Sequence, residues 1–362
     1  MCLPLALMNG CVDTEDAPVA EAAGAGGSSG SAGEGGEGPP AVVLPPPPVP
    51  AGPSDQPAPN GTESNLRVLP WAGFAAAVTY TFDDSQPSHL EHFGALNGLG
   101  VPFTFYVNPS QNRQAAYDST WQAAIAAGHE IGNHTMNHCR STLTECAQNA
   151  GSVEEEIDQC TTYIATRLGQ GAVWTFAYPY GDGGYAQYAP SRFLLARGVQ
   201  SGMVAHDGAT DPFRLPTIAA AGGEAGSVFS GHIDSAVTQS RWVIFLFHTV
   251  LPTSQNWGAG VDIASISQSV EHAKSLGTVW VDSVANIGAY VLGQRAFAAA
   301  TITTEGDSSS WTWTLPEPFP SGRVLRVSVD GGTLSQAGQP LAWDGHGYYE
   351  VSLDARSLTW SP

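Results

Sequence analysis

The chain has 362 residues, with 33 acidic side chains against 13 Lys and Arg and a formal net charge of −20 at pH 7. Its single lysine, Lys274, and its acidic balance argue against nucleic acid as a partner, because binding to a phosphate backbone requires a basic surface. The uncharged apolar runs fall short of the ~20 residues of a membrane-spanning helix, so no transmembrane span is expected.

Residues 1–65 differ in composition from the rest of the chain. They contain no basic residue and are rich in Gly, Ser and Pro, which predicts a disordered linker that is extended along its proline run. The first eleven residues resemble the end of a bacterial lipoprotein signal, in which Cys11 would be lipidated. We therefore expect an exported protein, secreted or anchored to the cell envelope.

Residues 66–297 alternate between strand-like and helix-like segments. Strand-like runs lie at 75–82, 101–107, 129–134, 172–178, 199–205 and 242–248, and helix-like runs near 88–98, 114–127, 152–168, 189–197 and 262–276. Strands that are apolar on both faces and separated by helices are typical of a parallel sheet. The pattern predicts an α/β domain whose sheet is closed, or nearly closed, into a barrel.

Residues 298–362 show a different pattern of short strands separated by Gly-rich turns, which predicts a small β-rich module. It contains six Trp and Tyr residues: Trp311, Trp313, Trp343, Tyr348, Tyr349 and Trp360. If exposed, they would stack on sugar rings. If buried, they would form the core that so small a module needs.

Three cysteines, Cys139, Cys146 and Cys160, lie within the predicted barrel. The segment from Ser152 to Leu168 begins with a capping box and places Cys160 on its apolar stripe. Cys160 is therefore expected to face inward, either as a buried thiol or in a bridge to one of the other two.

Two pairs of residues are of the types that bind metal ions. Asp83 and Asp84 end the first predicted strand, where a turn can direct both carboxylates into one pocket, although Asp84 could instead cap the next helix. His134 and His138 would share a side on a turn of helix and could bind one metal ion, although they could equally be surface histidines.

Four ordered motifs identify a family. TFDD at 81–84, HTMNH at 134–138, AYPYG at 177–181 and FLFH at 245–248 resemble the motifs of the family 4 carbohydrate esterases, the polysaccharide deacetylases with a NodB homology domain. The resemblance covers roughly residues 70–295 and implies a distorted (β/α) barrel.

The resemblance also implies roles for individual residues. Asp83 would be the catalytic base and His248 the catalytic acid, and the backbone N–H of Tyr180 would help to hold the oxyanion. The metal ligands would be Asp84, His134 and His138. The metal would be a divalent ion, with Zn²⁺ expected and Co²⁺ or another ion as alternatives.

The substrate would be an acetylated polysaccharide or oligosaccharide. We expect removal of N-acetyl groups from a GlcNAc-containing glycan such as chitin, an exopolysaccharide or peptidoglycan. The alternatives are an O-acetyl xylan esterase on the same scaffold and a catalytically inactive glycan-binding protein.

The third motif departs from the family pattern. Ala177 stands where the family usually has the arginine that pairs with the base, and we expect Arg214 to take its place. Ser85 replaces a usual glycine, with a small expected effect. Tyr178 and Pro179 are expected to shape the substrate site by making the turn rigid. Trp280 is expected either to form a wall of the acetyl pocket or to pack in the core.

Overall fold

The computed structural model describes residues 44–109, 116–146, 151–254 and 258–362.

One long strand closes the barrel. Within the described residues, seven parallel strands form a ring, and β2 closes it because one edge pairs with β9 and the other with β3. In order around the ring the strands are β2 (Ala76–Asp83), β3 (Thr104–Val107), β4 (Glu130–Asn133), β5 (Thr175–Ala177), β6 (Leu195–Ser201), β8 (Leu215–Ala219) and β9 (Arg241–Phe247). The predicted (β/α) barrel is confirmed.

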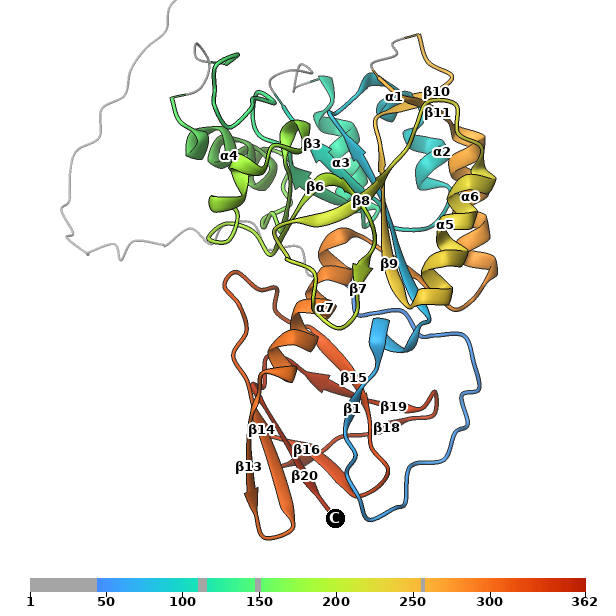
Figure 1. Ribbon diagram of the computed structural model, residues 1–362, viewed down its shortest axis with the longest axis vertical. Helices are drawn as coiled ribbons and strands as arrows, with labels where there is room; N and C mark the ends of the chain where they lie inside the picture. Colours follow the sequence, from blue (N-terminus) through green and yellow to red (C-terminus); the bar gives the residue numbers. More distant parts are fainter. Residues whose placement is uncertain (1–43, 110–115, 147–150, 255–257) are drawn as a thin grey trace, which may run out of the picture. The chain divides into compact units, whose positions relative to one another are not determined.

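Helices and short strands surround this ring (Figure 1). The helices are α1 (Pro87–Glu91), α2 (Phe93–Asn97), α3 (Asp118–Ala126), α4 (Val153–Thr162), α5 (Gly226–Gln239), α6 (Ile263–Ser275) and α7 (Val284–Ala298). The additional strands are β7 (Val204–Ala205), β10 (Thr249–Leu251), β11 (Gly260–Asp262) and β12 (Val279–Val281). Helices α5 and α6 pack against each other, and α5 also packs against β9.

The alternation of β2 separates an apolar outer face from a polar inner face. Val78, Tyr80 and Phe82 belong to the apolar cluster that the helices cover. The alternate residues Thr81 and Asp83 are also buried but point the other way, into the barrel, because successive side chains on a strand lie on opposite faces. Asp83 therefore reaches the barrel interior at the carboxyl end of β2.

The predicted helix at 189–197 is wrong, because β6 begins at Leu195 and pairs in parallel with β5. Leu194, Leu195 and Ala196 are buried, so this apolar run serves a central strand rather than a helix face. Arg197 follows it and is also fully buried. In the sequence, the arginine directly after this apolar run is the feature that could have indicated a strand whose Arg197 faces the barrel interior.

The C-terminal module consists of two antiparallel sheets. One contains β1 (Arg67–Val68), β15 (Val324–Ser328), β19 (Tyr348–Ser352) and β18 (Trp343–Asp344). The other contains β13 (Thr301–Glu305), β14 (Ser308–Thr312), β20 (Ser357–Ser361), β16 (Thr333–Gln336) and β17 (Gln339–Pro340). Four of its six Trp and Tyr residues are buried, namely Trp313, Tyr348, Tyr349 and Trp360. Most of these side chains therefore build the core of the module.

Residues 44–65 are not a free tether, in contrast to our prediction for residues 1–65. Arg323 donates hydrogen bonds to the carbonyls of Leu44 and Pro45, and Arg326 donates to those of Pro47 and Pro48. An extended proline segment has no internal hydrogen bonds, so its carbonyls are available to these two buried guanidinium groups.

Among the described residues, no helix combines the length and apolar character needed to cross a bilayer. The predicted lipidation site, Cys11, lies outside the described part of the chain.

A buried histidine is expected to make folding stability depend on pH. The backbone N–H of Phe103 donates to Nδ1 of His129 over 3.0 Å, and burial lowers the pKa of His129 from 6.5 to about 4. Below pH 6.5 His129 is protonated in the unfolded chain, but in the folded protein it stays neutral until about pH 4. The free energy of unfolding therefore falls as the pH falls from 6.5 to about 4. These values correspond to a loss of about 2 kcal/mol at pH 5.

Denaturant unfolding at pH 8 and pH 5 measures this effect. His129→Gln keeps an acceptor for the Phe103 N–H but does not titrate, so this variant should lose about 2 kcal/mol less than the wild type on acidification. Equal losses in the two proteins would contradict the prediction.

Candidate metal centre and active site

The two adjacent aspartates lie at the carboxyl end of β2. Asp83 is the last residue of the strand, and the next two residues, Asp84 and Ser85, have positive φ angles of 75° and 47°. This left-handed turn reverses the chain direction at the carboxyl end of the barrel. It is fixed by Ser85, whose Oγ accepts a hydrogen bond from the Asn108 N–H over 3.1 Å.

The two histidines lie on a loop rather than on the helical turn that we considered. His134 directly follows β4, and the His138 N–H donates to Oγ1 of Thr135 over 3.0 Å. The side chain of Glu156, on α4, accepts from the Asn137 N–H over 2.8 Å. These local hydrogen bonds hold the loop in a shape that brings both imidazoles to one place.

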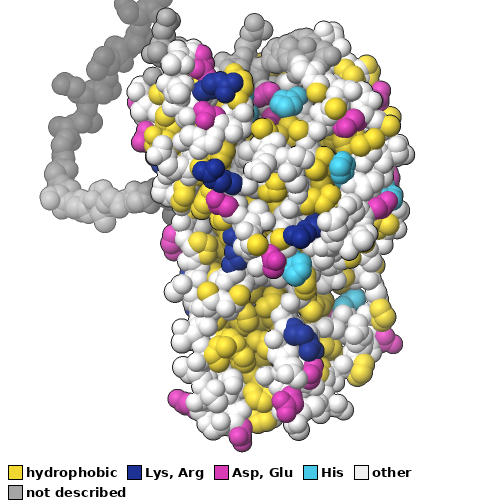
Figure 2. All heavy atoms as spheres, in the orientation of Figure 1, with side chains coloured by type: hydrophobic (Ala, Val, Ile, Leu, Met, Phe, Trp, Pro, Cys, Tyr) yellow, Lys and Arg dark blue, Asp and Glu magenta, His cyan; other side chains and the backbone are white. Residues whose placement is uncertain are grey.

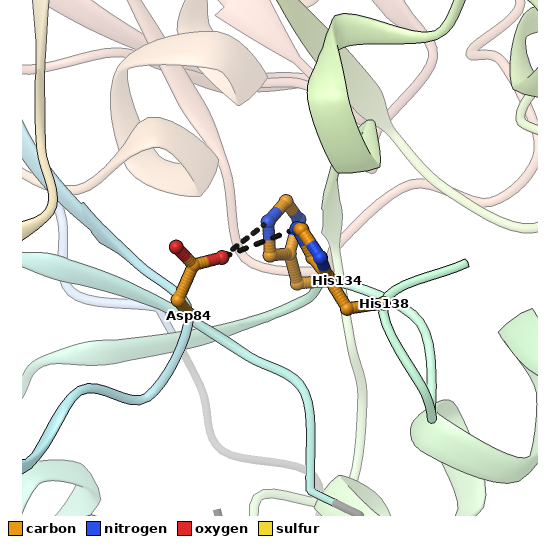
Figure 3. Close-up of side chains that lie close together, drawn as sticks. All are labelled: Asp84, His134 and His138. Carbon is orange, nitrogen blue, oxygen red and sulfur yellow. Dashed lines mark ion pairs between the residues drawn. The ribbon is translucent and has the colours of Figure 1, made fainter. Parts of the chain in front are cut away.

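Asp84, His134 and His138 form one cluster (Figure 3). Oδ1 of Asp84 lies 3.3 Å from Nε2 of His134 and 3.2 Å from Nε2 of His138. A tetrahedral ion with bonds of ~2.0–2.1 Å needs neighbouring ligand atoms about 3.3–3.4 Å apart, so these separations fit a zinc-like ion. The donor set, two imidazoles and one carboxylate, fits the same ion and leaves other coordination positions for water and substrate.

The three side chains of the cluster affect one another's protonation. Burial opposes protonation of His134, but its hydrogen bond to Asp84 outweighs this and raises the pKa of His134. Nδ1 of His134 donates to the Ala177 carbonyl over 2.7 Å, which directs Nε2 toward Asp84. Burial and the neighbouring charge of His134 lower the pKa of His138 to about 4, which leaves its imidazole neutral. Burial opposes ionisation of Asp84, but the hydrogen bond and charge of His134 outweigh it and hold the pKa of Asp84 well below its usual range.

The arginine that holds Asp83 is Arg197, on β6, and the prediction of Arg214 is wrong. Nη2 of Arg197 donates to Oδ1 of Asp83, and both side chains are buried. Arg214 is 63% exposed and faces Asp211 instead. Arg197 is the direct cross-strand partner of Ala177, so the guanidinium comes from the neighbouring strand at the same level of the barrel.

His248 lies at the edge of the cluster. Its Nε2 is 3.8 Å from Oδ2 of Asp84, and its side chain is partly exposed. Its backbone carbonyl accepts a hydrogen bond from Nε2 of His89 over 2.5 Å. His89 is fully buried, and burial lowers its pKa to about 4. Our sequence analysis did not predict this support of the His248 backbone.

Tyr180 lies against one histidine of the cluster. Its ring is 4.5 Å from that of His138, and the guanidinium of Arg140 lies 4.2 Å from the Tyr180 ring centre. Tyr180 has a φ of 58° within the short 3-10 turn Pro179–Gly181. The resulting turn exposes an aromatic side chain beside the metal ligands.

Two residues that were predicted to form or shape the substrate site are buried. Trp280 is fully buried and pairs with Ala77, near the amino end of β2, whereas Asp83 ends that strand. Six residues of strand separate these levels by about 20 Å, so Trp280 packs in the core and is not a wall of the acetyl pocket. Tyr178 is also buried, and its hydroxyl donates to the Phe213 carbonyl over 2.6 Å.

The cysteines resolve into one disulfide and one thiol. Cys139 and Cys146 are bonded, and Cys160 is free and buried. The disulfide begins at the residue after His138, and the carbonyl of Cys139 accepts a hydrogen bond from the Tyr185 hydroxyl over 2.6 Å. These two restraints help to fix the loop that carries the histidine.

Removal of one ligand should abolish tight metal binding. We expect Zn²⁺ to raise the melting temperature of metal-stripped wild-type protein, since a ligand that binds only the folded state stabilises it by about 2.7 kcal/mol at 100 times its Kd. Asp84→Asn and His138→Ala should lose this shift, and elemental analysis should find no bound metal in them. His272→Ala, outside the cluster, is the matched control. A full equivalent of metal in the Asp84→Asn protein would contradict the assignment.

A known family matches the part of the chain that carries these residues. The polysaccharide deacetylase family model matches residues 75–191, which include both aspartates, both histidines and the third motif. Among solved structures, the chain is similar to a family 4 carbohydrate esterase from Streptomyces lividans in complex with acetate, at 20% identity and a TM-score of 0.38 over 58% of this chain and 92% of that one.

Two further similar structures have comparable scores. The Xyl-CE4 domain of a multidomain xylanase from the hindgut metagenome of Trinervitermes trinervoides is 18% identical, with a TM-score of 0.39 over 59% of this chain and 89% of that one. A polysaccharide deacetylase from Bacillus cereus is 16% identical, with a TM-score of 0.38 over 57% and 91%. On the family match and the motifs within it, residues 75–191 of this chain belong to the polysaccharide deacetylase family.

Proposed function

We propose that this protein is a metal-dependent deacetylase that hydrolyses N-acetyl groups of a GlcNAc-containing polysaccharide. The proposal rests on one observation: two adjacent carboxylates have different partners. Asp84 lies with the imidazoles of His134 and His138, whereas Asp83 is held by Arg197 inside the barrel. Two carboxylates in contrasting environments can take two different roles in one reaction.

Asp84, His134 and His138 would hold the metal ion. When bound, a divalent ion such as Zn²⁺ would polarise the acyl carbonyl and lower the pKa of water toward ~7. Asp83 would accept the proton of the attacking water. Since Oδ1 of Asp83 is held by Arg197, the orientation of this carboxylate is fixed before the substrate binds, and its second oxygen can accept the proton.

His248 would supply the proton that the leaving group needs. An amine must be protonated as it leaves, because an amide anion is a much poorer leaving group than a sugar alkoxide. The partly exposed ring of His248 lies beside Asp84, and His89 fixes its backbone. The backbone N–H of Tyr180, after the Tyr178-Pro179 pair, would donate to the oxyanion, a contact typically worth about 3 kcal/mol.

Two alternatives remain to be tested. An O-acetyl xylan esterase would use the same side chains, since the chemistry differs mainly in the leaving group. A catalytically inactive glycan-binding protein was suggested by Ala177 alone, and the buried Asp83–Arg197 pair removes that reason.

We also propose that the protein is exported, with Cys11 as the candidate lipid anchor. The disulfide between Cys139 and Cys146 supports this location, because disulfides persist in oxidising compartments. Fractionation of cells should place the protein in the envelope or the medium, and its retention in the cytosol would contradict the proposal.

Acetate release tests the function directly. Metal-stripped protein would be assayed with chitooligosaccharides and with acetylated xylan, with and without Zn²⁺. Metal-dependent release from chitooligosaccharides supports the proposal, and release from xylan alone supports the esterase. No release from either substrate by metal-loaded protein would favour the binding protein.

Asp83→Asn should separate catalysis from metal binding. The amide keeps the size of the side chain but cannot act as the base, so kcat should fall by about 10²–10⁴-fold. Bound Zn²⁺, measured by elemental analysis, should stay at the wild-type level, because Asp83 is outside the ligand cluster. Unchanged kcat would show that Asp83 is not the base.

Arg197 is predicted to act through Asp83. Arg197→Ala should reduce kcat and lower stability by about 3–5 kcal/mol, because it leaves a buried carboxylate without its partner. The double variant Arg197→Ala/Asp83→Asn should regain much of that stability, since the unpaired charge is removed.

A second double variant tests the position of the guanidinium. Ala177→Arg/Arg197→Ala returns the arginine to the position usual in the family, and it should recover activity relative to Arg197→Ala. If Arg197→Ala had wild-type kcat and stability, the positioning role would be wrong.

A further inference from the structure

A cleft of about 260 Å³ lies between the turn that follows β5 and the strands β6 and β8. Its walls include the backbones of Gly181, Gly183 and Gly198 and the side chains of Val199, Gln200 and Arg214. Figure 1 shows β6 and β8 side by side in this part of the barrel. The residues used in the proposed reaction do not line this cleft.

Two of the glycines keep the cleft open. Neither Gly183 nor Gly198 has a positive φ, so the backbone at these positions would accept other residues. A Cβ added to Gly198 would lie 4.0 Å from its nearest neighbour, the Gly181 carbonyl oxygen, and one added to Gly183 would lie 3.9 Å from Nη1 of Arg214. Larger side chains here would therefore extend into free space and fill the cleft.

The lining combines apolar surface with hydrogen-bond donors. Val199 lines the cleft and is 48% exposed. Tyr180 does not line it but directly precedes the lining residue Gly181, and its side chain is 51% exposed. Arg214 Nε is 3.7 Å from Oδ2 of Asp211, which is beyond hydrogen-bond distance, so its donors can reach a ligand. Gln200, which also lines the cleft, adds a side-chain amide.

This combination matches the surface of a sugar ring. A pyranose has C–H faces that pack on aromatic and aliphatic side chains, and hydroxyl groups around its rim that accept hydrogen bonds from Arg and Gln. The volume lies just below the ~300–1,000 Å³ typical of ligand pockets, which suits one sugar residue rather than a polymer segment. On the face shown in Figure 2, basic side chains are separated from one another, which disfavours a polyanion as the occupant there.

The cleft also adjoins the metal centre. Gly181 directly follows Tyr180, whose ring contacts that of the metal-ligand candidate His138. We propose that this cleft is a glycan subsite, which binds a sugar residue next to the one that is deacetylated. The inference rests on the proposed function for the position of the reacting sugar, and it gives Arg214 a role in substrate binding.

Two cleft variants test the subsite. Gly198→Val fills the cleft with a residue favoured in strands, and Arg214→Gln removes the charged donor. For each we expect the ratio of kcat/KM for chitohexaose to that for 4-nitrophenyl acetate to fall about tenfold or more, mainly through KM. Loss of a hydrogen bond to a charged group is worth roughly 1.5–3 kcal/mol, and 1.4 kcal/mol corresponds to tenfold.

Arg67→Gln is the matched control, because Arg67 is 59% exposed and also faces an aspartate, Asp330, but lies on β1, which pairs with β15 of the C-terminal module. For Arg67→Gln, the ratio of kcat/KM for chitohexaose to that for 4-nitrophenyl acetate should equal the wild-type ratio. Arg214→Lys should keep part of the oligosaccharide preference. Melting temperatures of all variants would exclude unfolding as the cause.

A binding measurement separates this inference from the proposed function. Chitohexaose would be titrated calorimetrically into Asp83→Asn protein with and without Gly198→Val. Weaker binding with the filled cleft supports the subsite even if no acetate is released by the wild type. Equal binding and an unchanged kinetic ratio would overturn the subsite, even if wild-type deacetylation is confirmed.

Discussion

The buried ion pair between Asp83 and Arg197 is the interaction on which the candidate site depends. It joins β2 to β6 across the barrel interior, and both side chains are removed from water. The guanidinium also lies 4.5 Å from the ring centre of Tyr106, which has space because Gly132 has no side chain there. A Cβ at Gly132 would lie 2.4 Å from the Tyr106 ring. The position of Asp83 is thus determined by a stack of residues from four strands.

The neighbouring strand β5 connects this pair to the metal cluster. The carbonyl of Ala177 holds Nδ1 of His134, and Ala177 is the register partner of Arg197. One pair of adjacent residues on two strands therefore orients a candidate metal ligand and the candidate base at the same time. The two positions lie at the same level of the barrel, and the small side chain of Ala177 leaves the interior free for the guanidinium of Arg197.

The strand pattern and the ordered motifs predicted the barrel and the proximity of Asp84, His134 and His138, because strand ends in a parallel barrel meet on one face. The remaining errors have a common cause, since they depend on contacts between segments distant in sequence. Arg197 was assigned to a helix because its local sequence does not reveal its pairing with β5. For Trp280 the sequence left open a wall of the acetyl pocket or a core position, because a late motif does not give the register of β12 on β2. Residues 44–48 are held by Arg323 and Arg326, about 280 residues away, and no local composition can indicate such contacts.

The desolvation of Asp83 and Arg197 bears on the choice between an enzyme and a binding protein. A buried ion pair gives little net stability, because the loss of hydration offsets most of the attraction, and a well-packed apolar pair would serve a barrel equally well. A protein that only bound glycans would gain nothing from an oriented carboxylate beside a metal cluster. A hydrolase would gain a base whose position is fixed before the substrate arrives, which lowers the reorganisation needed at the transition state. The energetics of this one pair therefore favour catalysis over binding alone.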